Sequence, residues 1–205
     1  MPTQAALVRR GRHLSWITIA WSSTIGLVGL IEGVRSGSLA LVAFGLDAGV
    51  AVVAASVVLW RLDAARQGAS EGARAEPRAA RIVAISLLVL AAAISAEALR
   101  RLVLAHRPDP TAVGIVLAAA SIPVLTFLAR VKHRLGDRLG SRAVLTDAAE
   151  TALGAGLAAL LLVGLVAQST VGWWWADPLA ALGVAAVALR KGLRQLSPTT
   201  AISAR

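Results

Sequence analysis

Six long apolar stretches, separated by short polar segments, constrain this chain more than any other feature of its sequence. Several of them exceed about 18 residues with almost no charge, a length that predicts a transmembrane helix rather than a strand. The expected helices cover about residues 14–34, 38–62, 81–104, 111–130, 143–168 and 173–193. We therefore predict an all-α polytopic membrane protein with a six-helix domain at 14–193, between tails at 1–13 and 194–205.

The composition supports a membrane protein and excludes several classes of soluble protein. Apolar residues make up 57% of the chain and charged residues 16%, whereas soluble domains average about 45–50% and about 25%. The sequence contains no Cys, which excludes disulfides, thiolate metal sites and Cys nucleophiles. It also lacks a nucleophile–base motif and a phosphate-binding loop, so we expect a protein that is not an enzyme.

The positive charges follow the predicted topology. The net charge is +10, and 17 of the 21 Lys and Arg residues fall in segments that six spans place on one side. This asymmetry satisfies the positive-inside rule and predicts that both termini are cytoplasmic, in a cell (plasma or inner) membrane. The basic segments lack the interleaved aromatic residues of a nucleic-acid surface, so we expect the lipid bilayer as partner and no nucleic acid. The 17 residues are Arg9, Arg10, Arg12, Arg61, Arg66, Arg74, Arg78, Arg81, Arg130, Lys132, Arg134, Arg138, Arg142, Arg190, Lys191, Arg194 and Arg205.

Three acidic residues have a local structural explanation. Glu32 and Glu97 each precede an Arg by three residues, which predicts ion pairs within a helix near its end. Asp177 directly precedes Pro178. Asp at the N-cap followed by Pro at the first helical position is a favourable helix start, so we predict that Asp177 caps its own helix.

Asp47, Asp147 and Glu150 lack such an explanation. None of them has Lys or Arg three or four residues away, so none is neutralised within its own helix. Acidic groups at membrane depth commonly mark a pathway for ions or protons. Asp147 and Glu150 are three residues apart and share a helix face, and two close carboxylates disfavour double ionisation, so such a group can exchange a proton for a metal ion. Interhelical hydrogen bonds and an exposed helix end are the alternative explanations.

Small residues predict where helices pack closely. Gly45 and Gly49 form a Gly-xxx-Gly pair, and Gly154 with Ala158 forms a similar small-residue pair. Asp47 lies about 200° around the helix from each glycine of the first pair, at about 100° per residue. We therefore expect these glycines to face a neighbouring helix while Asp47 points into a different cleft.

Two parts of the chain resemble the membrane domain of the cation diffusion facilitator (cation efflux) family. The first is Ser-Gly-Ser-Leu-Ala-Leu-Val-Ala-Phe-Gly-Leu-Asp at residues 36–47, continuing to Val-Val-Leu-Trp-Arg-Leu at 57–62. The second is Asp-Ala-Ala-Glu-Thr at 147–151, followed by Gly-Trp-Trp-Trp-Ala-Asp-Pro-Leu-Ala-Ala at 172–181. The number, order and orientation of the predicted helices agree with that family, so the resemblance extends over most of the chain.

The resemblance implies a six-helix protein, usually a homodimer, that carries divalent cations such as zinc in exchange for protons. Members of the family hold the ion between a His/Asp-xxx-Asp motif on helix 2 and another on helix 5. Asp47 and Asp147 match the first position of each motif, whereas Ala51 and Thr151 stand where the second carboxylate is expected. Only the expected tail at 194–205 follows the last expected helix, so we expect no counterpart of the family's cytoplasmic C-terminal domain.

Two principal hypotheses follow. In the first, Asp47, Asp147 and Glu150 bind the metal, with Thr151 as an auxiliary ligand, and the protein exports Zn²⁺, Mn²⁺, Co²⁺ or Fe²⁺ by proton antiport without a tightly bound cofactor. An oxygen-only site suits hard ions such as Mg²⁺ and Mn²⁺ better than zinc. In the second, the protein is a non-transporting structural or regulatory protein with a degraded metal site, which an Arg paired with either Asp would favour. An organic-cation exporter and a membrane enzyme are the remaining alternatives.

Overall fold

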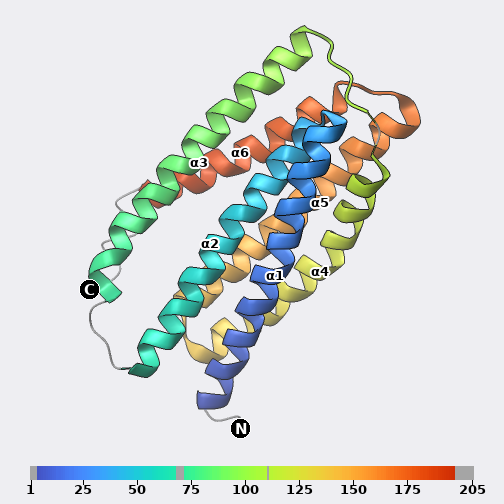
Figure 1. Cartoon of the computed structure of the whole chain (residues 1–205). Coiled ribbons are helices and arrows are strands. Elements are labelled where there is room, and N and C mark those ends of the chain that lie inside the picture. The colour runs from blue at the N-terminus through green and yellow to red at the C-terminus, as the bar shows by residue number, and fades with distance from the viewer. Residues whose placement is uncertain (1–3, 68–71, 110, 197–205) are drawn as a thin grey trace.

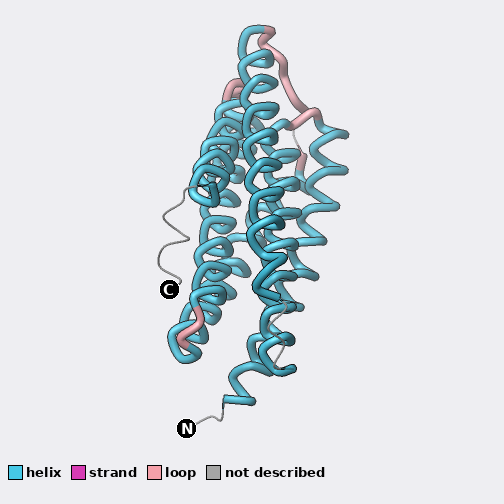
Figure 2. Tube along the Cα trace, turned by 90° about the vertical axis from the view of Figure 1, so that its left-hand side faces the viewer, coloured by secondary structure: helices cyan, strands magenta, loops and turns pink. Residues whose placement is uncertain are grey.

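The computed structural model describes residues 4–67, 72–109 and 111–196, and in that part the chain forms helices and connecting loops only (Figure 2). Successive helices alternate in direction, so the α1–α2, α3–α4 and α5–α6 loops lie at one end of the bundle (Figure 1). The start of α1 and the α4–α5 turn lie at the other end. The helices are α1 Gln4–Ser36, α2 Leu39–Gln67, α3 Gly72–Val103, α4 Ala112–Leu139, α5 Arg142–Val171 and α6 Ala176–Leu196.

The all-α fold predicted from the apolar stretches is confirmed. Within the described residues, three segments are long and apolar enough to cross a membrane: Arg9–Ser36, Ala112–Leu139 and Val144–Val171. Leu39–Val53 forms a shorter apolar helical segment. Six spans and the orientation of the termini stay predictions.

Several helices extend beyond the apolar stretches that predicted them. The first helix includes residues 4–13 of the expected N-terminal tail, and α4 continues nine residues past the expected end at 130. The last helix continues to Leu196, and the rest of the expected C-terminal tail, including Arg205, lies outside the described residues. Basic residues that hydropathy places in loops or tails therefore belong to the helical bundle.

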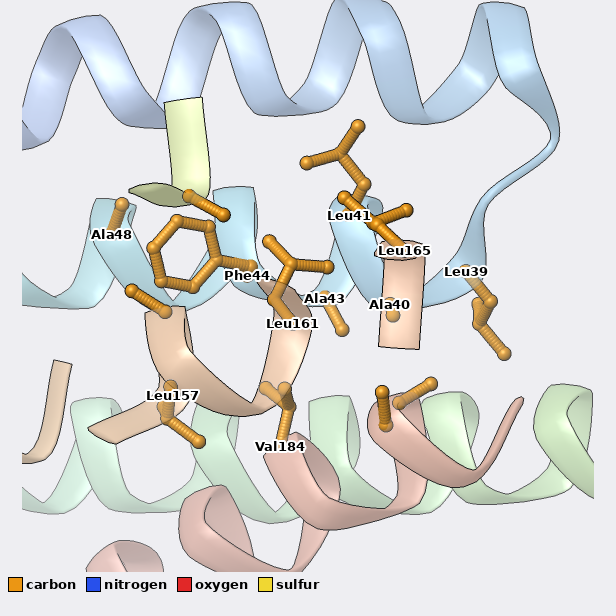
Figure 3. Close-up of a cluster of buried hydrophobic side chains, with 14 of the residues drawn as sticks. Leu39, Ala40, Leu41, Ala43, Phe44, Ala48, Leu157, Leu161, Leu165 and Val184 are labelled. Atoms are coloured by element: carbon orange, nitrogen blue, oxygen red, sulfur yellow. The ribbon is translucent and has the colours of Figure 1, made fainter. Parts of the chain in front are cut away.

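The main hydrophobic core lies where α2, α5 and α6 meet. Phe44 and Leu41 of α2 pack with Leu161 of α5 and Val184 of α6, and each of these side chains is buried (Figure 3). Alanines fill the spaces between these larger side chains, which allows the helices to approach closely. This packing fixes the relative positions of the helices that carry the candidate site residues.

A close backbone contact joins α1 to α2 at Gly45. A Cβ atom added there would lie 3.0 Å from the Leu30 amide nitrogen and 3.1 Å from the Gly26 carbonyl oxygen. Gly49, by contrast, is exposed and has open space around its Cα. The expectation that both glycines face a neighbouring helix is therefore correct for Gly45 and wrong for Gly49.

These two glycines provide a matched test of the α1–α2 packing. We expect Gly45→Ala to lower the free energy of unfolding by about 1–3 kcal/mol, because the atoms it meets are rigid backbone. Gly49→Ala should raise it by up to about 1 kcal/mol, because alanine favours the helix and meets nothing. Unfolding in mixed detergent micelles, followed by circular dichroism, measures both. Equal effects of the two substitutions would contradict the close contact.

The carboxylate of Asp177 connects the start of α6 to the start of α2. It accepts hydrogen bonds from the hydroxyl of Ser38 and, at 2.8 Å, from the backbone N–H of Leu39. Asp177 lies within the first turn of α6, which begins at Ala176, so its predicted role as the N-cap of its own helix is wrong. The start of α2 has N–H groups without intrahelical partners, and a buried carboxylate satisfies them and interacts favourably with the helix dipole.

The contribution of the Asp177 contact to the free energy of unfolding can be measured. We expect Asp177→Asn to lower the free energy of unfolding by about 1–3 kcal/mol, because the amide keeps one acceptor oxygen and places an N–H₂ group against donors. Asp137→Asn is the matched control, since Asp137 is exposed and pairs with His133 on the helix surface. Thermal unfolding in detergent compares the two. Equal melting temperatures would show that the contact does not contribute.

The predicted pairs at the helix ends are confirmed. Glu97 accepts hydrogen bonds from Arg100 at 2.7 Å and from Arg101 at 2.8 Å. Arg101 also donates to the Gly37 carbonyl oxygen, so the end of α3 contacts the α1–α2 turn. Glu32 lies 3.5 Å from the guanidinium three residues further along α1.

Candidate functional site

The first half of α5 carries three polar residues that point to two different neighbours. Asp147 and Thr151 are four residues apart and lie on one face, and the Thr151 hydroxyl donates to the Asp147 carbonyl at 2.8 Å. Glu150 lies about 100° around the helix from Thr151. One face therefore meets α4, and the other meets α2 and α6.

An ammonium group holds Asp47 and Glu150 together. The Nζ atom of Lys191, on α6, lies 2.9 Å from Oδ1 of Asp47 and 2.9 Å from Oε2 of Glu150. The side chains of Lys191 and Asp47 are 7% and 6% exposed, and that of Glu150 is 23% exposed. We call these three residues the Lys191 cluster. It joins α2, α5 and α6 and carries two negative charges against one positive charge.

A second ammonium group neutralises Asp147. The Nζ atom of Lys132, on α4, lies 2.7 Å from Oδ2 of Asp147 and donates to the Thr151 hydroxyl at 3.0 Å. The side chains of Lys132 and Asp147 are 1% and 5% exposed. We call these residues the Lys132 cluster. It is more completely buried than the Lys191 cluster, and its two charges balance.

The two lysines are the functional residues that sequence reasoning missed. Hydropathy placed Lys132 in a loop after the expected helix at 111–130, which is wrong because α4 continues to Leu139. Lys191 lies inside the expected helix at 173–193, but it was counted only as a topology charge and not as a partner for a carboxylate. Helical periodicity is a signal in the sequence that could have indicated that both lysines face the core. Lys132 is spaced by four and three residues from the buried Leu128 and Leu135, and Lys191 by three residues from the buried Ala188.

The structure distributes the predicted site residues over both clusters. Asp47 and Glu150 meet in one, while Asp147 and Thr151 belong to the other. Asp147 and Glu150 therefore do not act as one carboxylate pair on a common face. Each of the three carboxylates pairs with a lysine of another helix rather than within its own helix.

Two small cavities border the clusters. The larger one, of about 20 Å³, is lined among others by Asp47, Glu150 and Thr151 and by the α1 residues Thr18 and Ser22. A cavity of this size holds about one water molecule. Ala51, at the position where a second carboxylate was expected, lines the same cavity. The space therefore has hydroxyl and carboxylate oxygens on its walls but lacks one expected ligand.

The smaller cavity, of about 10 Å³, lies beside the Lys132 cluster. Ser15 of α1, Lys132 and Asp147 are among the residues that line it. Thr151 lines the larger cavity and accepts a hydrogen bond from Lys132, so the Lys132 ammonium contacts a residue of each cavity wall. Polar groups thus follow α5 over more than one helical turn.

The donor set fits a hard divalent cation better than zinc. Within the described residues, no group of three His, Cys, Asp or Glu side chains converges in a way that could hold a metal ion. Two carboxylates, from Asp47 and Glu150, converge on one point. Carboxylate, hydroxyl and water oxygens suit Mg²⁺ and Mn²⁺, whereas tight zinc sites use nitrogen or sulfur.

The Lys132–Asp147 pair is expected to behave as a coupled unit. Asp147→Asn or Lys132→Met alone should lower the free energy of unfolding by about 3–5 kcal/mol, because each leaves a buried charge without its partner. The double substitution should lose less than the sum of the two single losses, since it leaves neither charge. Unfolding of all four proteins in mixed micelles completes the cycle. Additive losses would contradict the pairing.

Comparisons with known proteins agree with this architecture. The family model of the cation efflux transmembrane domain matches residues 15–202. The chain is 29% identical to the uncharacterized transporter sll1263 of Synechocystis over 169 residues, which cover 80% of this chain and 54% of the relative. It is 30% identical to the magnetosome protein MamB of Paramagnetospirillum magneticum over 168 residues, covering 80% and 56%. Transmembrane protein 163 of Xenopus laevis is 25% identical over 189 residues, covering 92% and 66%. The chain thus spans about half to two thirds of the length of these relatives.

Proposed function

This chain belongs to the cation efflux family, and we propose that it carries divalent metal cations across a membrane through its helical bundle. The observation that carries the proposal is the convergence of Asp47 of α2 and Glu150 of α5 on one buried point, beside a small cavity that three hydroxyl side chains also line. Carboxylates buried inside a helical bundle are typical of cation pathways in membrane proteins. One relative of this chain is named only as a transporter, and its similarity supports the same activity.

The cation would bind between the Asp47 and Glu150 carboxylates. Thr18, Ser22 and water would supply further oxygen ligands. Asp147 would serve a second step of the same pathway, because it lines the neighbouring cavity. With oxygen ligands only, we expect Mn²⁺ and Mg²⁺ to be better substrates than Zn²⁺.

Exchange for protons, export from the cell and a homodimer complete the proposal. A carboxylate that loses its metal on the acidic side of a membrane gains a proton there, which couples the two fluxes. These features come from the family resemblance. The cation site itself rests on the geometry of this chain.

Transport is tested in proteoliposomes that contain a metal-sensitive dye and carry an imposed pH gradient. We expect proton-dependent uptake of Mn²⁺ by the wild type and a decrease of at least about tenfold for Asp47→Asn and Glu150→Gln, because each removes a charged ligand. Zn²⁺, Co²⁺ and Fe²⁺ are measured in the same assay.

Asp137→Asn is the control for this assay, since it removes a carboxylate from the exposed surface of α4. It should transport like the wild type. Absence of flux for all four metals in correctly folded wild-type protein would exclude the proposed function.

One observation favours a second function, that of a non-transporting structural or regulatory protein on the same scaffold. Asp47 and Asp147 are each neutralised by a lysine of another helix. Ala51 and Thr151 also lack the carboxylates that the family resemblance leads us to expect. For such a protein the lysine pairs would serve stability alone, and the flux assay distinguishes the two functions.

A further inference from the structure

The Lys191 ammonium lies where a cation bound by Asp47 and Glu150 would lie. It is 2.9 Å from one oxygen of each carboxylate. Oxygen ligands lie at about 2.0–2.1 Å from Mg²⁺ and at about 2.3–2.6 Å from Ca²⁺. A divalent ion at the same point therefore requires each carboxylate to move inward by less than about 1 Å, a distance that side-chain rotation covers.

The ammonium group and a divalent cation exclude each other at this point. Both are positive and both use the same two oxygens, and the Lys191 and Asp47 side chains are only 7% and 6% exposed, so solvent screens their repulsion weakly. The two carboxylates together match the charge of one divalent ion. With Lys191 present as well, the cluster would carry an uncompensated positive charge inside the bundle, which is strongly unfavourable.

The backbone beside Lys191 is tightly packed, so any movement of this residue must come from its side chain. At the adjacent Gly192, a Cβ atom would lie 2.8 Å from the Leu88 side chain and 3.1 Å from the Ala84 carbonyl oxygen, so α6 packs tightly on α3 there. The lysine side chain has four rotatable methylene groups and is well suited to move its charged end along an apolar surface. Lys191 is five residues from the end of α6, so its ammonium can withdraw toward that end of the helix.

We propose that Lys191 is a tethered cation that occupies the site between Asp47 and Glu150 and makes it selective for divalent over monovalent cations. This inference rests on the proposed function. A free monovalent ion that replaces the ammonium restores the same charge and loses its translational freedom, so the exchange is unfavourable. A divalent ion gains one additional unit of attraction to the two carboxylates and can therefore displace the lysine.

The test uses the full chain in nanodiscs and compares the wild type with Lys191→Met and Lys191→Arg. Mn²⁺ binding is measured by isothermal titration calorimetry. Lys191→Met removes the competing charge at nearly constant volume, and it should bind Mn²⁺ at least about tenfold more tightly. A tenfold gain corresponds to a wild-type protein in which Lys191 has left the two carboxylates in at most about 10% of molecules, because the apparent affinity falls by that fraction. Lys191→Arg keeps the charge and should retain the weaker affinity. An unchanged or weaker affinity of Lys191→Met would overturn the proposal.

The selectivity is tested with ammonium and potassium ions in the same preparations. Both ions should raise the melting temperature of Lys191→Met and compete with Mn²⁺, while neither should do so in the wild type. Lys132→Met is the matched comparison, because its ammonium faces one carboxylate and a hydroxyl. It should gain less Mn²⁺ affinity than Lys191→Met. An equal gain would show that removal of any buried lysine suffices and would overturn the proposal.

The repulsion between the two carboxylates makes a folding defect in Lys191→Met informative. If this variant folds poorly, ammonium, methylammonium or Mn²⁺ in the buffer should restore its helicity, because each supplies the missing cation. Failure of all three to do so would overturn the proposal.

The outcome is separable from that of the proposed function. Wild-type flux with unchanged Mn²⁺ affinity in Lys191→Met retains the transport activity and rejects the tethered cation. Tighter Mn²⁺ binding by Lys191→Met without wild-type flux would support the tethered cation and reject the transport activity.

Discussion

The pairing of buried carboxylates with lysines from other helices is the interaction on which the rest of this structure depends. A charge that is removed from water inside a helical bundle must be compensated nearby, because its solvation is lost. Asp47 and Glu150 depend on Lys191, and Asp147 depends on Lys132. These contacts join α6 to α2 and α5, and α4 to α5. The two lysines thus connect four of the helices.

The same bundle is tied together at its other end by groups that satisfy helix termini. The Asp177 carboxylate accepts hydrogen bonds at the start of α2, and Arg101 donates to the turn before it. Two of the sequence segments that carry the family resemblance, 36–47 and 172–181, meet at this contact. The occurrence of both segments in one chain therefore has a physical reason, because the second segment provides the hydrogen-bond acceptor for the donors of the first. This contact also places Asp47, two helical turns further along α2, at a defined depth in the bundle.

The chain belongs to the cation efflux family, but the charges around its candidate site differ from those that the family resemblance leads us to expect. The family model covers almost the whole chain, yet Ala51 and Thr151 replace two expected carboxylates. Two lysines enter the same region and change its charge balance from strongly negative to nearly neutral. A site with this balance differs from an open cluster of acidic ligands, because any entering cation must first exchange with a positive group of the protein itself. A lysine that competes with the cation must leave the carboxylates when the cation binds, whereas a purely structural lysine stays in place.

The sequence by itself determined the helical fold, the segments that pack closely at Gly45, and the three carboxylates that need a partner. These features depend on hydropathy, on residue size and on spacing within one helix, which are local properties. Only the tertiary structure decided that Asp147 and Glu150 face different neighbours, that Asp177 caps α2, and that Lys132 and Lys191 are buried. Each of these depends on contacts between helices separated by many residues in the chain. The neutralising charge for a buried carboxylate can come from any helix that packs beside it, so spacing along a single helix does not reveal it.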